Sequence, residues 1–319
     1  LRGDGQMYVA VGTEQGQVLV LDARGRKHWS FQCAGPIRGS VALADVNDDN
    51  EREIIAGCSD GFLYILTHDG RLMHRFDANS PIESTPAVWE DKIIFGCNDG
   101  MIYCINVNGD VLWTFASKGK ILARPLIARV QEGDRRNVLV GSKDNSLYAL
   151  DLHGNLEWRY ETQGAIMNEP VLTRVGRDRE AIIVLGSCDN KVHAVSGRGD
   201  RLWTYEADFW VVASPAIVDL DGDGKLEVLA GSYDHNLYIL DCEGEYVLEY
   251  MPGISGVVHQ AGHYAEVLTR EAGRQVGKRL FQMRMPGVVI GCSQIRKGAA
   301  LLATKSGQLV AVGFAEQER

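Results

Sequence analysis

Several features that would point to a membrane, nucleic-acid or redox function are absent from this sequence. No run of 18 apolar residues occurs, so no membrane span is predicted. The 33 Lys and Arg residues are outnumbered by 42 Asp and Glu residues, and the net charge of −9 argues against a nucleic-acid-binding surface. The sequence also has no CxxC pair, no adjacent cysteines, no phosphate-binding glycine loop and no recognisable Ser/His/Asp grouping.

The seven cysteines are odd in number and scattered, which does not indicate a disulfide framework. Cys58 and Cys97 directly follow a repeated glycine, at a position that Ser142, Ser187 and Ser232 hold in other copies, so this position is a slot for a small residue. We therefore expect free thiols in a reducing compartment, which favours the cytoplasm. A periplasmic or extracellular location stays open, because a removed signal peptide would leave no trace.

What the sequence does contain is one pattern that occurs seven times. In each copy a small residue ends an apolar run, a tight turn follows, and a second apolar run comes next. The spacings are 45, 39, 45, 45, 45 and 72 residues, and the last is one 45-residue period plus 27 extra residues. A fixed period in this range indicates a repeat architecture. The seven positions are Gly12, Gly57, Gly96, Gly141, Gly186, Gly231 and Ala303.

The segment from Ser214 to Tyr250 shows what one repeat builds. Four short runs rich in Val, Ile, Leu and Tyr are separated by Gly, Asp and Asn turn residues, with no helical periodicity between them. This excludes helical solenoids. Four antiparallel strands per repeat predict an all-β fold, a single β-propeller of four-stranded blades. The runs lie around Ala216–Asp219, Glu227–Ala230, Asn236–Leu240 and Tyr246–Tyr250.

A tryptophan lies 17 residues after the turn glycine in four copies, within the phrase D-x-x-G-x-x-x-W-x-[FY]. On this motif the chain resembles the pyrroloquinoline-quinone-like (BamB-like) β-propeller family, whose blades end in a tryptophan-docking motif. The resemblance implies tryptophans that pack between blades. It also implies no bound quinone, since the outer-membrane assembly lipoprotein BamB is a cofactor-free member. The four residues are Trp29, Trp113, Trp158 and Trp203, and His74 and Leu248 hold the position in two further copies.

The repeats predict a single domain over residues 1–319, with a non-repeat insertion within 252–285. Seven turn-and-strand units predict seven blades, and six or eight stay as alternatives. The first unit lacks its first strand and the last lacks its fourth, so ring closure and the blade count stay open. A chain that starts in the middle of a motif is expected to be a fragment of a larger protein.

An Asp-rich segment at residues 219–227 has the composition of a Ca²⁺ loop. Oxygen ligands at alternate positions, a glycine for the sharp turn and a closing acid suit a cation that takes six to eight oxygens. The spacing resembles the short calcium loop of integrin-type FG-GAP propeller repeats. The resemblance implies a structural Ca²⁺ site, with an acidic solvated turn as the alternative. Its ligands would be Asp219, Asp221, Asp223 and Glu227 through side chains and Lys225 through its carbonyl.

A degraded copy of this loop lies in the second repeat, where a metal is a weaker expectation. Asn50 replaces the glycine, although Asn also adopts the left-handed conformation. The third and fourth repeats have lost the pattern, so calcium is not needed to make a blade. The ligand candidates are Asp45, Asn47, Asp49 and Glu53.

The residues just before each first strand are the first candidates for a ligand or partner surface. Scaffold positions recur between repeats, whereas these positions differ from blade to blade, apart from a recurring core Ile. A solvated loop edge, whose charges pair with one another, is the alternative. The variable residues are Arg38, Glu83, Arg124, Asn168, Glu169 and Arg284, with the aromatic pair Phe209 and Trp210 at the same rim.

The insertion contains two further features. His259, His263 and Glu266 could share one helical face and hold a transition metal, although Gly262 weakens that helix. Basic and apolar residues alternate over Ala265–Arg284, which suits either a partner-docking arm or a decorated surface loop.

These observations favour a non-catalytic propeller that binds other proteins, within a larger protein or complex. A ligand- or ion-sensing domain of a signalling or defence protein is the main alternative. A quinone-dependent dehydrogenase is disfavoured by the lack of a vicinal Cys-Cys pair, and a polysaccharide lyase has only Glu83 and Glu169 as rim acids. Fold does not imply function, and the sequence indicates neither the partner's identity nor the oligomeric state.

Overall fold

The structure is a computed structural model that describes residues 7–175, 180–248, 273–296 and 298–313. It divides into two compact units, Leu1–Leu172 with Ser187–Asp189 and Thr173–Gly186 with Asn190–Arg319. The described residues contain strands and turns but no helix, which confirms the all-β class. They also contain no helix of the length and apolarity that would cross a membrane.

Each repeat forms one antiparallel sheet, which we call a blade and number in chain order. The strands of blades 1 to 4 are β1 Tyr8–Gly12, β2 Gln17–Asp22, β3 Lys27–Gln32, β4 Ala42–Ala44, β5 Glu53–Gly57, β6 Phe62–Leu66, β7 Leu72–Asp77, β8 Ala87–Trp89, β9 Lys92–Gly96, β10 Met101–Ile105, β11 Val111–Ala116, β12 Leu126–Ala128, β13 Asn137–Gly141, β14 Ser146–Asp151 and β15 Leu156–Glu161. The later strands are β16 Val171–Val175, β17 Glu180–Gly186, β18 Lys191–Ser196, β19 Arg201–Glu206, β20 Ala216–Val218, β21 Glu227–Gly231, β22 Asn236–Asp241, β23 Glu245–Leu248, β24 Gly273–Val276, β25 Arg279–Arg284, β26 Val289–Arg296, β27 Ala299–Thr304 and β28 Leu309–Gly313.

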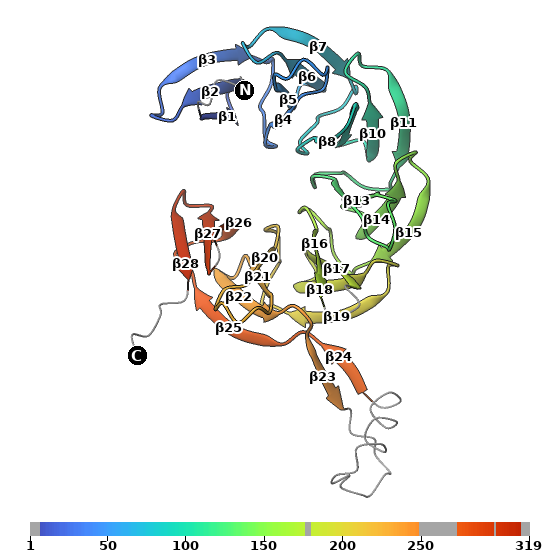
Figure 1. Cartoon of the computed structure of the whole chain (residues 1–319), viewed down its shortest axis with the longest axis vertical. Helices are drawn as coiled ribbons and strands as arrows, with labels where there is room; N and C mark the ends of the chain where they lie inside the picture. The colour runs from blue at the N-terminus through green and yellow to red at the C-terminus, as the bar shows by residue number, and fades with distance from the viewer. Residues whose placement is uncertain (1–6, 176–179, 249–272, 297, 314–319) are drawn as a thin grey trace, which may run out of the picture. The chain divides into compact units, whose positions relative to one another are not determined.

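The fold is a seven-bladed β-propeller, as the repeats predict. Blades 2 to 5 have four strands in sequence order, and blade 6 is built from β20, β21, β22 and β25. The described part of blade 1 holds β1–β3 and that of blade 7 holds β26–β28, so three strands are described in each. In Figure 1 the fourth strands β7, β11 and β15 follow the outer edge of the first unit, whereas β4 and β8 lie at its inner edge.

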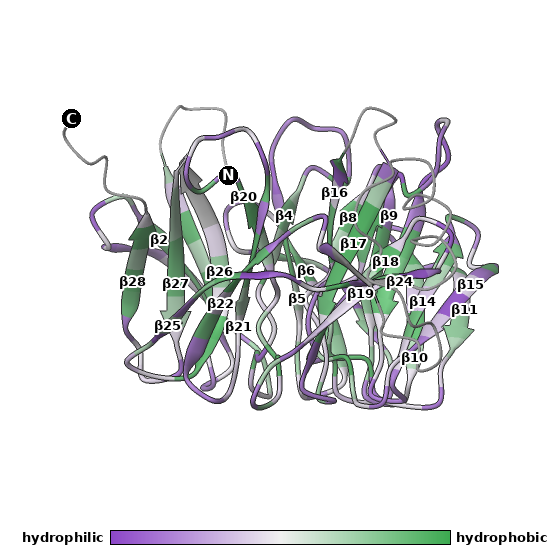
Figure 2. Ribbon diagram, turned by 90° about the horizontal axis from the view of Figure 1, so that it is seen from below, coloured by the Kyte–Doolittle hydropathy of each residue, from purple (hydrophilic) through white to green (hydrophobic). Residues whose placement is uncertain are grey.

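The hydrophobic core lies between neighbouring blades. One buried cluster joins blades 2 and 3 through residues such as Ile65 and Phe95, and another joins blades 6 and 7 through Leu237 and Leu302. The second and third strands are accordingly buried along most of their length, whereas the fourth strands alternate between exposed and half-buried residues. Polar residues gather in the loops at both ends of the sheets (Figure 2). Each blade therefore depends on its neighbour for burial, as expected of a repeat protein.

The repeated glycine is required by packing between blades. A Cβ on Gly57 would lie 2.5 Å from Cγ2 of Ile82, the recurring Ile of the loop that leads into the next blade. Ile82 is fully buried, which confirms that this Ile belongs to the core. The hairpin turn that follows needs a positive φ four residues after the glycine, where Gly61 has φ 95° and Asn145 has φ 70°.

The tryptophans pack between blades, as the family resemblance implies. The indole nitrogen of Trp29 donates to the main-chain oxygen of His68, and that of Trp203 donates to Cys242, at 3.0 and 3.1 Å. In both cases the acceptor lies in the turn between the third and fourth strands of the next blade. His74 takes the same position in blade 2 and packs against Gly109.

The sequence wrongly predicts the fourth strand of blade 6. Glu245–Leu248 pairs with Gly273–Val276 in a separate two-stranded hairpin, β23–β24, which we call the arm. The fourth strand is β25, Arg279–Arg284, in which Phe281 takes the tryptophan register opposite Ile239. Only β25 continues directly into blade 7, where Val289 packs on Gly231. The insertion therefore interrupts the turn between the third and fourth strands.

Candidate functional site

The strand ends of each blade carry two different sets of loops. At one edge, the turn between the second and third strands of a blade lies beside the loop that leads into that blade. In blade 2, for example, the N–H of Ser59 in this turn donates to the oxygen of Pro36 in the loop from blade 1. We call this edge the rim. The turns between first and second strands, which include the Asp-rich loops, lie at the opposite edge.

In the first unit the predicted rim charges pair with one another. Arg38 Nη1 donates to Glu83 Oε1 at 2.7 Å, and its Nε lies 3.6 Å from Glu14. Arg124 Nη1 and Glu169 Oε1 are 3.5 Å apart. Both pairs join residues 45 apart, so each links neighbouring blades. These ion pairs fit the description of a charged loop edge, and they leave both arginines half-exposed.

The fourth rim loop also holds Asn168, which is buried. The neighbouring Glu169 carboxyl is partly buried, and this burial raises its pKa, although the Arg124 guanidinium opposes the shift.

Phe209 and Trp210 are different, because both are exposed. The two residues are 44% and 42% exposed, and their rings stack with centroids 5.2 Å apart. They occupy the positions that Gly164 and Ala165 hold one repeat earlier. The backbone contacts are the same in both blades: Ser187 Oγ donates to the oxygen of Gly164 and Ser232 Oγ to that of Phe209, at 3.0 and 3.1 Å.

This comparison separates the role of the loop backbone from that of the two aromatic side chains. The N–H of Cys188 donates to the Ala165 oxygen and the N–H of Tyr233 to the Trp210 oxygen, both at 2.9 Å. The loop thus keeps its hydrogen bonds with a small residue or an aromatic one. The two rings are therefore an addition that the fold does not require.

Tyr233 and two cations extend this aromatic surface. The ring of Tyr233 lies 6.2 Å from that of Trp210, and Lys305 Nζ donates to its hydroxyl at 2.9 Å. Arg284 Nη1 donates to the oxygen of Asp234, in the same turn, at 2.5 Å. We call Phe209, Trp210, Tyr233, Arg284 and Lys305 the aromatic patch. Both cations are exposed, so the patch is apolar at its centre and positive at its sides.

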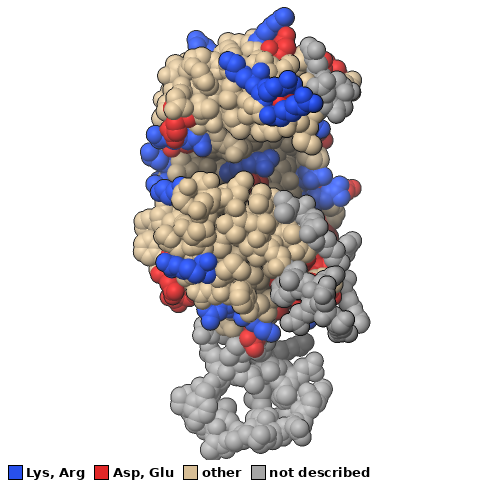
Figure 3. Space-filling model, turned by 90° about the vertical axis from the view of Figure 1, so that its left-hand side faces the viewer, with Lys and Arg blue, Asp and Glu red and all other residues tan. Residues whose placement is uncertain are grey.

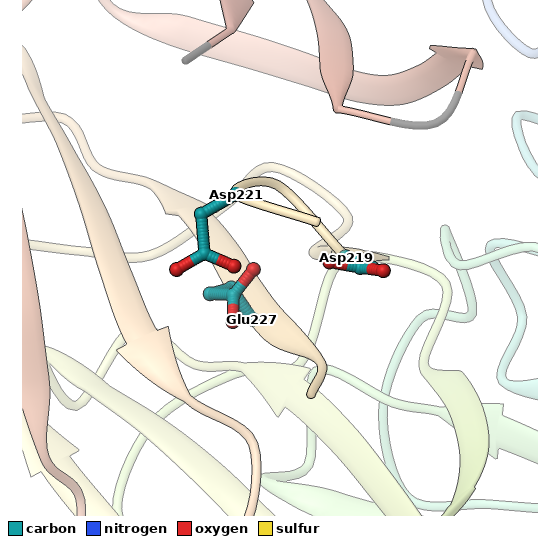
Figure 4. Close-up of side chains that lie close together, drawn as sticks. All are labelled: Asp219, Asp221 and Glu227. Atoms are coloured by element: carbon teal, nitrogen blue, oxygen red, sulfur yellow. The ribbon is translucent and has the colours of Figure 1, made fainter. Parts of the chain in front are cut away.

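The predicted Ca²⁺ loop brings three carboxylates together. In the described part of the chain, Asp219, Asp221 and Glu227 each offer an oxygen within 4.8 Å of the others. Figure 4 shows the carboxylates of Asp221 and Glu227 facing one another, with Asp219 beside them. Asp223 lies outside this group, and its Oδ1 accepts the N–H of Lys225 at 2.7 Å.

Glu227 is the buried member of this group, with 6% of its surface exposed. Its Oε2 accepts the N–H of Leu220 at 2.7 Å. Burial raises the pKa of Glu227, and the carboxylates of Asp221, Asp223 and Asp219 raise it further. A bound cation would offset this repulsion, and carboxylate oxygens are the ligands that Ca²⁺ prefers. The donor set therefore fits Ca²⁺.

The weaker loop at 45–53 is closed by its own hydrogen bonds. Both carboxylate oxygens of Asp45 accept backbone N–H groups, from Asp49 and Asn50, and Asn47 Nδ2 donates to Asp49. Asn50 has φ 65°, so it replaces the glycine as the sequence predicts. Glu53 is 1% exposed, and its Oε1 has no hydrogen-bond partner. The loop repeats the buried Glu but does not gather its acids into a group of three.

Sequence reasoning missed the role of the turn aspartate. Asp144 accepts the Tyr148 hydroxyl at 2.7 Å and the N–H of Lys118, in the preceding blade, at 2.8 Å. Asp60 makes the equivalent contacts with Tyr64 and Ala34. The recurring G-x-x-D turn and the Tyr four residues after the Asp give the signal, since two polar groups repeat at fixed spacing. The motif is structural.

The transition-metal candidates of the insertion, His259, His263 and Glu266, lie outside the described residues.

Two further surface features offer no site as clear as the aromatic patch. On the face shown in Figure 3, the described Lys and Arg side chains form several separate groups, most with an Asp or Glu at their edge. A groove of about 410 Å³ in the second unit, between β19 and the arm, is lined by Lys191, Arg201, Leu202, Thr204, Glu206, Gln275 and Val276.

Two family models match the chain. The model described as outer membrane protein assembly factor BamB covers residues 59–274, more than half of the 319 residues. The lambda-carrageenase β-propeller domain matches residues 8–92. No curated protein matches the chain in sequence.

Solved structures share the fold at low sequence identity. BamB from Moraxella catarrhalis has 16% identity and a TM-score of 0.68, covering 98% of this chain and 83% of its own. The computationally designed Ika8 protein has 16% identity and a TM-score of 0.69, with 96% and 80% covered. BBS1N, solved in complex with ARL6DN, has 13% identity and a TM-score of 0.60, with 99% and 90% covered. Identities this low show the fold alone.

Proposed function

Because the chain belongs to the family of the outer membrane protein assembly factor BamB, we propose that it is a non-catalytic scaffold that binds another protein through the aromatic patch. The proposal includes no quinone and no reaction. Membership in an assembly-factor family supports a binding role, and the patch supplies a surface for it. The cytoplasmic location expected from the scattered cysteines stays a prediction that cell fractionation tests.

The exposed stacking of Phe209 on Trp210 is the observation that carries the proposal. Aromatic residues are enriched at protein interfaces and dominate their energetics. In a neighbouring blade the same loop positions hold Gly164 and Ala165 with the backbone hydrogen bonds unchanged, so folding does not explain the two rings. Two large apolar side chains in water that do not serve the fold are best explained by a partner that covers them.

The chemistry of the patch indicates the kind of partner. Lys305 and Arg284 lie at its sides and are exposed, on a chain whose net charge is −9. An acidic chain with a local cationic rim favours a partner segment with carboxylates beside an apolar or aromatic side chain. We therefore propose an acidic peptide segment, with an apolar anchor that packs on Trp210.

The test compares wild-type protein with the double variant Phe209→Gly, Trp210→Ala. This variant copies the sequence at Gly164 and Ala165, so its fold and unfolding temperature should be unchanged. Proximity labelling in the source cell, followed by mass spectrometry, identifies the partner, and titration of the purified partner measures affinity. We expect the double variant to weaken binding at least about 30-fold, which corresponds to the loss of one buried aromatic anchor at about 2 kcal/mol.

A control variant separates the patch from general surface hydrophobicity. Leu156, on the fourth strand β15, is 49% exposed and lies away from the rim. Leu156→Thr should leave partner binding unchanged. Equal binding by wild type and the double variant would overturn the proposed surface, whereas loss of binding with Leu156→Thr would show that contacts with the partner extend beyond the rim.

We also propose that the 219–227 loop binds a structural Ca²⁺ ion. The support is the gathering of Asp219, Asp221 and Glu227 within 4.8 Å, together with the raised pKa of the buried Glu227. Such an ion would fix the loop between β20 and β21 and would perform no chemistry of its own.

A further inference from the structure

Cys33 and Cys58 lie on opposite sides of the interface between blades 1 and 2. Cys33 directly follows β3, and Cys58 directly follows β5. They are 3% and 0% exposed and belong to one buried cluster. The Cys58 thiol donates to the oxygen of Gly35 at 3.0 Å. All seven cysteines are free thiols in this structure.

The repeat supplies an independent measure of how close these two side chains lie. Ser117 and Ser142 are the equivalent residues at the interface between blades 3 and 4, and both pairs are separated by 25 positions. The two serine hydroxyls are 3.3 Å apart, and Ser142 also donates to Gly119 as Cys58 does to Gly35. The side chain that follows the turn glycine therefore contacts the side chain of the first residue in the loop that leads into the same blade.

We propose that, under oxidising conditions, Cys33 and Cys58 form a disulfide that links blade 1 to blade 2, in place of the free thiols expected in a reducing compartment. The shared cluster and the contact between the equivalent serines place the two sulfur atoms at the same junction. At the next interface the residue opposite Cys97 is Ala78, so the same bond cannot form there.

The reaction is thiol–disulfide exchange with a small-molecule disulfide such as oxidised glutathione. The thiolate of one cysteine attacks one glutathione sulfur, which forms a mixed disulfide and releases one glutathione thiolate. The thiolate of the other cysteine then attacks the protein sulfur of this mixed disulfide, which closes the bond between Cys33 and Cys58 and releases the second glutathione. Two protein thiols are oxidised, one glutathione disulfide is reduced to two thiols, and the two protein protons pass to the released thiolates.

In the folded chain, contact between the two thiols lowers the pKa of Cys58 and raises the pKa of Cys33. Because both thiols are buried, the exchange takes place while the chain folds or when the interface opens. In those states the contact is broken, so either thiolate can attack first.

The test refolds the reduced, full chain in a buffer of reduced and oxidised glutathione, followed by alkylation and non-reducing tryptic mass spectrometry. We expect a linked pair of peptides, His28–Arg38 with Glu53–Arg71, and a fall in free thiols from seven to five. Closing this loop should lower the unfolding equilibrium constant roughly 100- to 1,000-fold relative to the reduced chain. Alkylation of both Cys33 and Cys58 in the refolded, folded chain would overturn the proposal, as would pairing of either with another cysteine.

Matched variants keep the result interpretable. Cys58→Ser copies Ser142, and Cys33→Ser copies Ser117, so both should fold. Each should abolish the linked peptide and the gain in stability, whereas Cys97→Ser should keep both. Ala78→Cys places a partner opposite Cys97 and serves as the positive control. If the engineered pair forms under conditions in which Cys33 and Cys58 stay reduced, the proposal is wrong.

Discussion

The indole nitrogen of Trp113 lies 2.9 Å from the main-chain oxygen of Leu152, in the next blade. Gly154, two residues further on, lies beneath the indole ring. The tryptophan of one blade and the D-x-x-G turn of the next thus form one structural unit, and the same geometry joins Trp29 to the turn at His68. Much of the repeated motif serves to hold blades together.

Gly154→Ala is predicted to destabilise the protein strongly. An added Cβ would lie 2.7 Å from the Trp113 ring, at a residue with φ 83°. We expect a loss of about 2–4 kcal/mol, from strain at positive φ and from overpacking. Gly133 is the control, because it has φ 97° and nothing lies within 4 Å of its Cβ. Gly133→Ala should cost only about 1–2 kcal/mol in urea unfolding. Equal losses would show that contact with the indole adds nothing.

Stability should fall at high pH because a buried tyrosine must ionise. Tyr238 donates to Asp234 at 2.6 Å, and burial together with this bond raises its pKa to about 12. The unfolded value is about 10, so the contribution is complete below pH ~10 and is lost as pH rises through ~12. Tyr238→Phe should reduce the slope of unfolding free energy against pH in this window. An unchanged slope would contradict this assignment.

Calcium should stabilise the chain through the 219–227 loop. At 100 times the dissociation constant, Ca²⁺ would add about 2.7 kcal/mol to the unfolding free energy. Asp221→Asn and Glu227→Gln should remove the Ca²⁺-dependent rise in Tm, because both residues belong to the group of three carboxylates. Asp49→Asn, in the self-closed loop of blade 2, should not affect it. If calorimetric titration of the wild-type protein detects no Ca²⁺ binding, the proposed site is wrong.

The arm should be removable without loss of the propeller. The N–H of Asp241 donates to the oxygen of Lys278 at 2.8 Å, so the insertion leaves and re-enters blade 6 at one point. Replacing residues 242–277 with Leu-His-Gly, the turn at 152–154, would rebuild a tight turn that also serves Trp203. We expect a cooperative unfolding transition within about 1 kcal/mol of wild type. Loss of cooperative unfolding would mean that β25 needs the arm.

Periodicity predicted the fold because every blade packs against its neighbours through the same types of residue at the same positions. The glycine spacing located the seven blades, the D-x-x-G phrase located the tryptophan contacts, and the recurring Ile was predicted to be core. The same reasoning failed at Tyr246–Tyr250. Its D-x-x-G turn is intact, but the strand that follows pairs in the arm, and Arg279–Arg284 replaces it. Local pattern cannot distinguish two segments that both suit the register.

The candidate site was predictable as a set of positions but not as a surface. Sequence comparison between repeats selected Arg38, Glu83, Phe209 and Trp210 alike, since all four vary. Only the structure separates the first two, which pair with one another, from the last two, which stack and stay exposed. Pair formation depends on where neighbouring loops meet, and a single repeat does not contain that information.

The sequence by itself determined which residues must be small, apolar or able to adopt a left-handed turn, because these demands repeat with the chain and act over a few residues. The tertiary structure decided which residues from different blades meet. Cys33 with Cys58 and Trp113 with Leu152 each depend on groups from different blades brought together by packing. Such contacts are set by the spacing between sheets and loops, which no local pattern encodes.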